Sequence, residues 1–322
     1  MPIVYVVSDD FNYPAGGIKK LYELVDTLNK HHIQSFIIHN EKNFRATWFE
    51  NKTKVIDIAS AKVTYDDIII FPEVFGEDIK NYWPGVRKII FSQNSFYALQ
   101  VFYGKIKKMK EVYLDKDVIN IIVVSQYDFD FFAWLFPGIK ISKITCGIDE
   151  RLFFFNPNKL KTITVMPRKS EADFIFLKNL MRIHDSFNDF KIVEIDNMPY
   201  EQCAETIRNS SIFLSFSHQE GFGLPPAEAM ACGCIVIGYH GYGGKEYFKE
   251  GLTYTIDSWD MRKYATILAE IIKGFGTNPE VLQQIRKDAS KYILENYSMA
   301  KQEKSMVQII KTHINLDHNN YL

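Results

Sequence analysis

Two glutamates, Glu220 and Glu228, flank a glycine-rich turn in the second half of this 322-residue chain. The residues between them read Gly-Phe-Gly-Leu-Pro-Pro-Ala, and they follow an apolar run, Ile212 to Phe216, that is typical of a fully buried strand. The prolines indicate a helix start, where a missing N–H costs least. A strand, a glycine turn and a helix N-terminus present backbone N–H groups and a positive dipole end to an anion such as phosphate. Because neither carboxylate is needed to hold a phosphate, the pair indicates a further ligand.

A purely structural explanation accounts for Glu228 alone. We expect Glu228 in the first turn of the helix, where the helix dipole stabilises an acidic side chain. That explanation does not cover Glu220, Phe222 and the glycines together, so we interpret the stretch as a binding site.

The run from Glu220 to Glu228, continued by Ala-Met-Ala-Cys-Gly-Cys-Ile-Val, resembles the signature of the family 4 retaining glycosyltransferases. In that family two glutamates are likewise separated by seven residues. The resemblance implies an α/β protein of the GT-B fold: two Rossmann-like doubly wound domains with an interdomain cleft and a C-terminal crossover helix. It also implies a nucleotide-diphosphate sugar as the donor substrate, with no cofactor and no metal. Within the stretch it implies that Glu220 contacts the sugar and Glu228 the ribose, with donor contacts from Gly221, Phe222, Gly223 and Leu224.

A departing diphosphate needs cations, and Arg168 and Lys169 follow an expected strand, Thr162 to Met166. In most family members the arginine follows a glycine and the lysine comes about a turn later, whereas here the two residues are adjacent. Which of them meets the phosphates is left open by the sequence. The alternative is a pair of solvated basic residues at a strand end.

Four further positions are candidates in the first half of the chain. Gly16 and Gly17 close the loop after the first expected strand, and by resemblance this loop faces the diphosphate and the acceptor. Gln93 and Asn94 follow another strand end, where their amides suit acceptor hydroxyls. A helix N-cap by Asn94 or Ser95 explains the same residues equally well.

Two candidates of lower specificity accompany the signature. His218 lies two residues before Glu220, near the expected nucleotide or sugar, although histidines at strand ends are commonly structural. The turn Gly241 to Glu246 corresponds to a glycine-rich donor-side turn in the family, and a surface loop is the equal alternative.

The composition limits the class of protein. Hydrophobic residues make up 47% of the chain, enough for a substantial core, and the net charge of -1 argues against a dedicated nucleic-acid binder. Four cysteines without framework spacing suggest reduced packing residues. Without a basic leader or an apolar run of transmembrane length, we expect a soluble cytoplasmic protein. The basic cluster Lys105 to Lys110 leaves open peripheral contact with the inner face of a membrane.

Alternating strand and helix patterns predict two successive mostly parallel sheets. Expected strands of the first half cover residues 3–7, 33–38, 55–58, 67–71, 88–92, 119–124 and 141–146, and those of the second cover 162–166, 191–194, 212–216, 234–238 and 252–256. Helices are expected over 172–184, over 200–208 and from Met261 onward, with breaks near Gly274–Gly276 and near Tyr297–Ser298.

We therefore assign residues 1–150 to an N-terminal acceptor-side domain and 161–296 to a donor domain, with residues 151–160 as the linker. We expect residues 297–322 to contribute a C-terminal helix that packs back onto the first domain.

The predicted function is transfer of a sugar, of hexosyl type, to a hydroxyl of a saccharide or lipid-linked saccharide acceptor, as in polysaccharide biosynthesis. Two other functions stay open: a catalytically silent sugar- or partner-binding module of the same fold, and a phosphorylase or epimerase.

Overall fold

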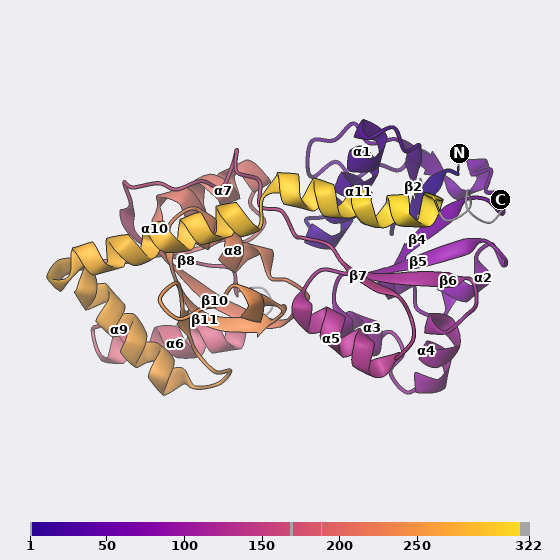
Figure 1. Cartoon of the computed structure of the whole chain (residues 1–322). Coiled ribbons are helices and arrows are strands. Elements are labelled where there is room, and N and C mark those ends of the chain that lie inside the picture. Colours follow the sequence, from indigo (N-terminus) through magenta and orange to yellow (C-terminus); the bar gives the residue numbers. More distant parts are fainter. Residues whose placement is uncertain (1, 168–169, 188, 316–322) are drawn as a thin grey trace. The chain divides into compact units, whose positions relative to one another are not determined.

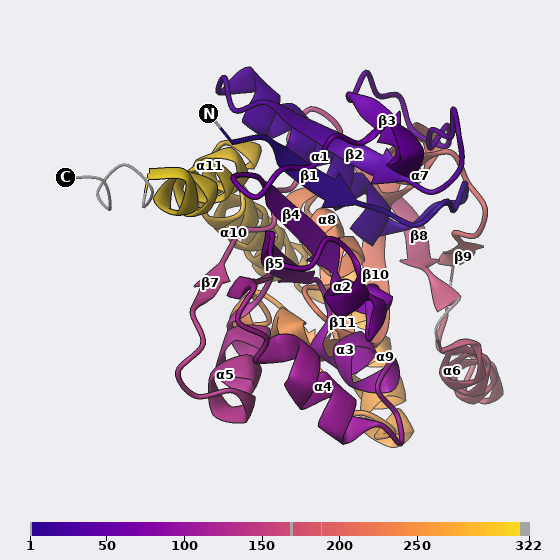
Figure 2. The same cartoon turned by 90° about the vertical axis from the view of Figure 1, so that its right-hand side faces the viewer.

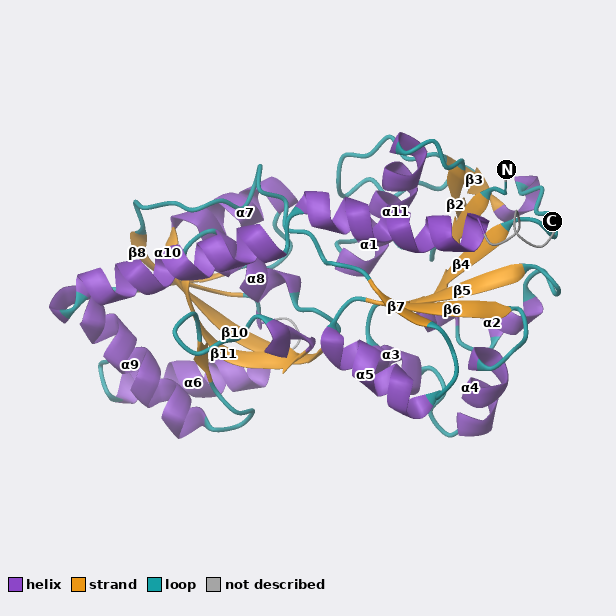
Figure 3. Ribbon diagram, in the orientation of Figure 1, coloured by secondary structure: helices purple, strands orange, loops and turns teal. Residues whose placement is uncertain are grey.

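The computed structural model describes residues 2–167, 170–187 and 189–315. The chain divides into two compact units, unit 1 with Met1–Thr145 and Ala300–Leu322, and unit 2 with Cys146–Met299. In each unit the helices enclose a central set of strands (Figure 3). Both units are Rossmann-like α/β structures, as the sequence predicts.

Unit 1 contains a seven-stranded parallel sheet of order β3-β2-β1-β4-β5-β6-β7. Its strands are β1 (Val4–Val7), β2 (Ser35–His39), β3 (Val55–Asp57), β4 (Ile68–Pro72), β5 (Arg87–Ser92), β6 (Val118–Val123) and β7 (Ile141–Lys143). Strands β1 and β4 are predominantly apolar because helices cover both faces of the sheet. Strand order reverses between β1 and β4, and doubly wound sheets bind ligands at such a reversal, outside the carboxyl ends of the strands.

The helices of unit 1 lie on both faces of this sheet. They are α1 (Gly16–Lys30), α2 (Asp78–Asn81), α3 (Ser95–Gln100), α4 (Ile106–Tyr113), α5 (Gln126–Leu135) and α11 (Met299–Asn315), with short 3-10 turns η1 (Ile58–Ser60) and η2 (Glu73–Phe75). Helices α1 and α11 lie on one face, and α3, α4 and α5 on the other (Figures 1 and 2). The second face packs an apolar cluster that includes Phe71, Phe102, Tyr113 and Phe132.

Polar contacts fix the last helix, α11, to the rest of unit 1. The Lys20 Nζ donates to Gln302 Oε1 at 2.8 Å, and His31 Nε2 lies 2.6 Å from Glu303 Oε1. At the far end of the helix, His313 Nε2 lies 3.1 Å from Asn120 Nδ2 in the buried interior. Residues far apart in the sequence thus complete one unit.

Unit 2 contains a five-stranded parallel sheet of order β12-β11-β10-β8-β9. Its strands are β8 (Leu160–Val165), β9 (Lys191–Glu194), β10 (Ser210–Glu220), β11 (Ile235–Tyr242) and β12 (Tyr254–Thr255). Its helices are α6 (Glu171–Ile183), α7 (Tyr200–Asn209), α8 (Leu224–Ala231), α9 (Met261–Thr277) and α10 (Pro279–Asn296), with the 3-10 turn η4 (Gly243–Glu246). Here strand order reverses between β8 and β10. Helices α7, α8 and α10 lie on one face of the sheet, and α6 and α9 on the other (Figure 1).

The helix break expected near Gly274–Gly276 is present, slightly later in the chain. Helix α9 continues through both glycines to Thr277, and the chain turns only at Asn278, before Pro279 begins α10. Gly274 faces the neighbouring helix, where an added Cβ would lie 3.3 Å from Leu282 Cδ1. Close helix packing, rather than a chain break, therefore accounts for this glycine.

Among the described helices, none is both long enough and apolar enough to cross a membrane. All four cysteines are buried free thiols. This agrees with the expectation of reduced packing residues.

Candidate functional site

Glu220 lies at the carboxyl end of β10, and this strand is longer than expected. The sequence predicts that the strand ends at Phe216, but it continues to Glu220, which pairs with Tyr242 of β11. The register shifts between Ser217 and Glu220, and Gln219 takes a positive φ of 49° within this irregular stretch. The polar residues remain in the sheet because β11 extends beside them. Glu220 is consequently held by paired backbone at the strand end, not by a free loop.

The turn after Glu220 leads directly into α8. Gly223 is the N-cap residue, with a left-handed φ of 82°, and α8 begins at Leu224 with both prolines in its first turn, as predicted. An added Cβ at Gly223 would lie 2.9 Å from the Tyr247 hydroxyl, which itself lies 3.1 Å from the Phe222 carbonyl oxygen. In the described part of the chain, no side chain caps this helix start. Pro225 and Pro226 have no N–H, so the amides that this helix start offers to an anion are those of Gly223 and Leu224.

Phe222 has a structural role. Its ring is 4% exposed and packs against the rings of Tyr247 and Tyr297, at centroid distances of 5.1 and 5.2 Å. The side chain anchors the turn in the core of unit 2, so any ligand contact at this position falls to its backbone.

A second glycine-rich turn, η4, packs directly against the first. A Cβ added at Gly243 would lie 1.8 Å from the Gly221 carbonyl oxygen, a distance that no side chain tolerates. At Gly241 a Cβ would come within 3.0 Å of the Glu220 side chain. The three glycines of residues 241–246 are buried and support the backbone that carries Glu220, whereas Tyr242 and Lys245 are exposed. A donor contact by this turn stays a prediction.

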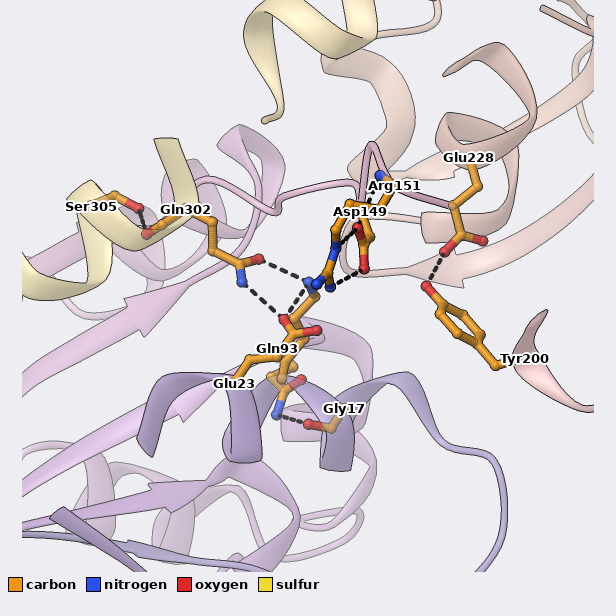
Figure 4. A network of polar contacts seen from close by, with 10 residues as sticks. Gly17, Glu23, Gln93, Asp149, Arg151, Tyr200, Glu228, Gln302 and Ser305 are labelled. Atoms are coloured by element: carbon orange, nitrogen blue, oxygen red, sulfur yellow. Dashed lines mark hydrogen bonds and ion pairs between the residues drawn. The ribbon is translucent and has the colours of Figure 1, made fainter. Parts of the chain in front are cut away.

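Glu228 occupies the fifth position of α8, so its expected place in the first helical turn is wrong. The helix begins at Leu224 because Gly223 is left-handed, and this puts Glu228 on the second turn. The side chain is largely buried, and its Oε1 accepts a hydrogen bond from the Tyr200 hydroxyl at 3.2 Å (Figure 4). The dipole explanation for Glu228 therefore does not apply, whereas a carboxylate held in one orientation suits ligand binding.

Tyr200 was not identified from the sequence. It is the first residue of α7, after Pro199, and its ring packs edge-on against Phe153 at 5.7 Å. A tyrosine at a helix start carries no signal of its own, and its partner lies 28 residues away.

His218 has a set of structural partners. Its Nε2 lies 3.1 Å from Asp173 Oδ2 of α6, and its ring packs against Tyr239 and Trp259 at 5.1 and 6.1 Å. These contacts fix the imidazole beside the end of β10. A donor contact by His218 stays a prediction.

The expected cation pair follows β8, the strand next to β10 at the reversal of strand order. Strand β8 ends at Val165, and Arg168 and Lys169 lie outside the described residues. By sequence they follow Val165, the end of β8, which pairs with Leu214 of β10.

In unit 1, Gly17 and Gln93 are in direct contact. The Gln93 Nε2 donates to the Gly17 carbonyl oxygen at 3.2 Å (Figure 4), and a Cβ on Gly17 would lie 3.1 Å from Gln93 Oε1. Helix α1 begins at Gly16, with Ala15 as its N-cap residue. Gln93 and Gly17 therefore lie together near the point where strand order reverses between β1 and β4, and their contact with a diphosphate or an acceptor stays a prediction.

Asn94 acts as a helix cap, which was one of its two interpretations. Its side chain accepts a hydrogen bond from the Phe96 N–H at 3.0 Å at the start of α3. The next amide, Ser95 N–H, donates to the buried Asp128 at 3.2 Å. The turn is thereby fixed from both sides, and Gln93 is the member that reaches toward Gly17.

Glu73 is a second residue that the sequence did not reveal. It follows β4, is 2% exposed, and its Oε2 accepts the Gln93 N–H at 2.9 Å. Burial raises its pKa from an ordinary 4.5 to about 8, and the Asp128 charge adds to this effect. A carboxyl group that stays protonated at neutral pH thus lies beneath the Gln93 turn. Only the pairing of β4 and β5 brings the two residues together, so no local pattern marks Glu73.

Comparisons with known proteins agree with this geometry. Residues 190–311, which include the signature, match the family model described as glycosyl transferases group 1. An alpha-1,6-glucosyltransferase from Actinobacillus pleuropneumoniae serotype 7 is 32% identical over 190 residues, covering 57% of this chain and 54% of that protein. The chain therefore spans about half the length of this curated relative.

Solved structures extend the likeness to both units. Sucrose-phosphate synthase from Thermosynechococcus elongatus is similar with a TM-score of 0.73 and 13% identity, covering 98% of this chain and 100% of that one. Anabaena HepE in complex with UDP-glucose has a TM-score of 0.70 and 12% identity, covering 96% and 99%. By fold the chain is therefore a GT-B protein, and by sequence its residues 190–311 match the group 1 glycosyl transferases.

Proposed function

We propose that this protein is a retaining glycosyltransferase that moves a hexosyl group from a nucleotide-diphosphate sugar to a hydroxyl of a saccharide or lipid-linked saccharide. The observation that supports this proposal most strongly is the make-up of the stretch from Glu220 to Glu228. It contains a carboxylate at a strand end, a helix start without a side-chain cap, and a buried carboxylate whose orientation is fixed by a hydrogen bond. The match of residues 190–311 to group 1 glycosyl transferases supports it independently.

Each part of the stretch suits one part of the donor. Glu228, held by Tyr200, accepts hydrogen bonds from ribose hydroxyls, because two acceptor oxygens match two vicinal donors. The Gly223 and Leu224 N–H groups, which precede the two prolines of α8, take the diphosphate. Glu220 orients the transferred sugar through its hydroxyls. We assign charge neutralisation to Arg168 and Lys169 rather than to a metal ion, since both are cations that follow β8 in the sequence.

The transfer step follows from these assignments. The bond between the anomeric carbon and the phosphate oxygen breaks, and its electron pair stays on the diphosphate. The acceptor hydroxyl oxygen forms the new bond on the same face, which retains the configuration. Its proton passes to the departing phosphate oxygen, so no separate base is required. The protein contributes orientation and stabilises the charge that develops on the diphosphate.

UDP-glucose is the donor to test first. The curated relative is named an alpha-1,6-glucosyltransferase, and one similar structure holds UDP-glucose. On the acceptor side, unit 1 supplies Gln93 and the Gly17 backbone, which are polar groups suited to a sugar hydroxyl.

The first experiment measures thermal stabilisation by a panel of nucleoside diphosphates and their sugars, since a ligand that binds only the folded state raises the Tm. We expect one nucleoside diphosphate to raise the Tm of the wild type but not that of Glu228→Gln. The control is Glu250→Gln, which changes an exposed glutamate of unit 2 and should be stabilised like the wild type.

A second experiment identifies the reaction. Proton NMR of the product with the preferred donor reads the anomeric configuration, in buffer with and without EDTA. We expect retention, unaffected by EDTA, and loss of transfer in Glu220→Gln. Sugar binding without any nucleotide binding contradicts the proposal and indicates a silent module. Release of a sugar phosphate without nucleotide indicates a phosphorylase instead.

A further inference from the structure

Helices α4 and α5 of unit 1 form an unusually apolar and basic surface. Three large hydrophobic side chains project from it: Tyr103 before α4 is 90% exposed, Ile106 is 61% exposed, and Trp134 on α5 is 76% exposed. Side chains of this size are rarely left in water without a purpose when they occur together. The two helices lie side by side in Figures 1 and 2. We call this region, with the lysines of α4, the α4–α5 surface.

The α4–α5 surface contains a groove. A concavity of about 460 Å³ lies between the two helices, with apolar walls that include Ile106, Leu114 and Leu135. Lys107 and Lys110 also line it. Ile106, Lys110 and Leu114 follow one another at four-residue spacing, so they share one side of the helix. Met109, Val112 and Tyr113 of α4 are buried in the core of unit 1.

The lysines of α4 divide into two pairs. Lys105 forms an ion pair with Glu77 at 2.7 Å, and Lys108 forms one with Glu111 at 3.1 Å. Lys107 and Lys110 form no ion pair with a residue of the described ranges, and both line the groove. Their positive charge therefore lies at the groove, beside the exposed side chain of Ile106.

We propose that the α4–α5 surface binds a bilayer that contains anionic phospholipid. Trp134 and Ile106 would insert at the level of the headgroups, where an aromatic ring with a polar edge is favoured. Lys107 and Lys110 would bind lipid phosphates while their aliphatic stems lie along the groove. A planar apolar layer under a negatively charged surface satisfies the exposed rings and the two lysines together. The inference goes beyond the proposed transfer reaction and depends on unit 1 alone.

The test uses the full chain without donor, so its outcome is independent of catalysis. Co-sedimentation is measured with phosphatidylcholine vesicles that contain phosphatidylglycerol and with vesicles of phosphatidylcholine alone. We expect binding to the anionic vesicles only, weakened by salt. Lys107→Gln/Lys110→Gln lowers the partition coefficient by about 30-fold, about fivefold for each lysine. The matched control is Lys287→Gln/Lys291→Gln on α10, which removes the same charge from unit 2 and leaves binding near the wild-type level.

Tryptophan emission gives a second measurement. The chain has four tryptophans, and we expect a blue shift with anionic vesicles that is lost in Trp134→Phe while co-sedimentation largely persists. Absence of wild-type binding, or an equal loss in the control pair, overturns the proposal. Binding of poly-glutamate without binding of vesicles overturns it as well, and then indicates an acidic protein partner.

Discussion

Glu73→Gln isolates the contribution of one buried carboxyl group to the stability of unit 1. In the folded protein burial raises the pKa of Glu73 from about 4.5 to about 8. Below pH 4.5 the carboxyl group is protonated in both the folded and the unfolded state, so the pKa difference does not affect the free energy of unfolding. Between pH 4.5 and 8 the unfolded chain releases the proton and the folded chain keeps it, so stability falls as pH rises. Over the whole interval the loss is about 5 kcal/mol, since one pKa unit corresponds to about 1.4 kcal/mol.

Glutamine keeps a carbonyl oxygen for the Gln93 N–H but cannot ionise. We therefore expect the free energy of unfolding of Glu73→Gln to be insensitive to this titration. Between pH 5.5 and pH 8 the wild type should lose about 3 kcal/mol more than the variant. Asp128 and Tyr113, the titratable groups coupled to Glu73, are present in both proteins.

The assay is urea unfolding at several pH values, followed by tryptophan emission in a Trp259→Phe background. Trp259 lies in unit 2 and the other three tryptophans lie in unit 1, so the emission then reports unit 1. Glu41→Gln, an exposed change in the same unit, is the control and should follow the wild type. Parallel pH curves for wild type and Glu73→Gln would refute the reasoning and assign Glu73 an ordinary pKa.

Three further predictions concern other sites. Tyr200→Phe removes one hydrogen bond to Glu228, so calorimetry should show a Kd for the preferred nucleotide raised about 2- to 10-fold, with a smaller effect on its 2′-deoxy analogue. Gly243→Ala forces the two glycine turns apart and should destabilise unit 2 by about 1–3 kcal/mol or more in thermal unfolding, whereas Gly276→Ala, where a Cβ meets nothing within 4 Å, should not. Burial lowers the pKa of His313 from 6.5 to about 4, so between these pH values the unfolded chain binds a proton that the folded chain does not. The free energy of unfolding therefore falls by about 3 kcal/mol as the pH drops through this interval. In His313→Gln, urea unfolding should show a smaller fall over the same pH range.

The sequence predicted the two sheets because apolar runs separated by helical patterns are a local signal. Each expected strand overlaps an observed one, and Lys191–Glu194 matches at both ends. The predicted ends of strands were wrong where pairing with a neighbouring strand extended the strand beyond its apolar residues. The polar residues Ser217 to Glu220 show no strand pattern, but β11 extends beside them and keeps them in the sheet. The break between α9 and α10 lies slightly beyond Gly274 for a related reason, since this glycine packs against Leu282 of the next helix.

The candidate site divides in the same way. Glu220, Glu228 and the glycines between them could be predicted because they lie close together in the sequence and form a recognisable pattern. Glu73 and Tyr200 were missed because each acts on a partner that only the fold brings near, Gln93 across neighbouring strands and Glu228 from another helix. Residues that bind a ligand can carry a sequence signature, whereas residues that orient them generally cannot.

The two glutamates of the signature have different environments, and this difference explains why their spacing matters. Glu220 is partly exposed on paired strand backbone, and Glu228 is buried on a helix with a hydroxyl partner. The turn between them cannot relax, because Gly223 is left-handed and Gly243 packs against the Gly221 carbonyl. A helix rotates by about 100° per residue, so adding or removing one residue before Glu228 would turn its carboxylate away from Tyr200. The seven-residue separation is thus fixed by a strand end, a rigid turn and one helical turn, each of which is needed to keep one carboxylate accessible while the other is buried and oriented.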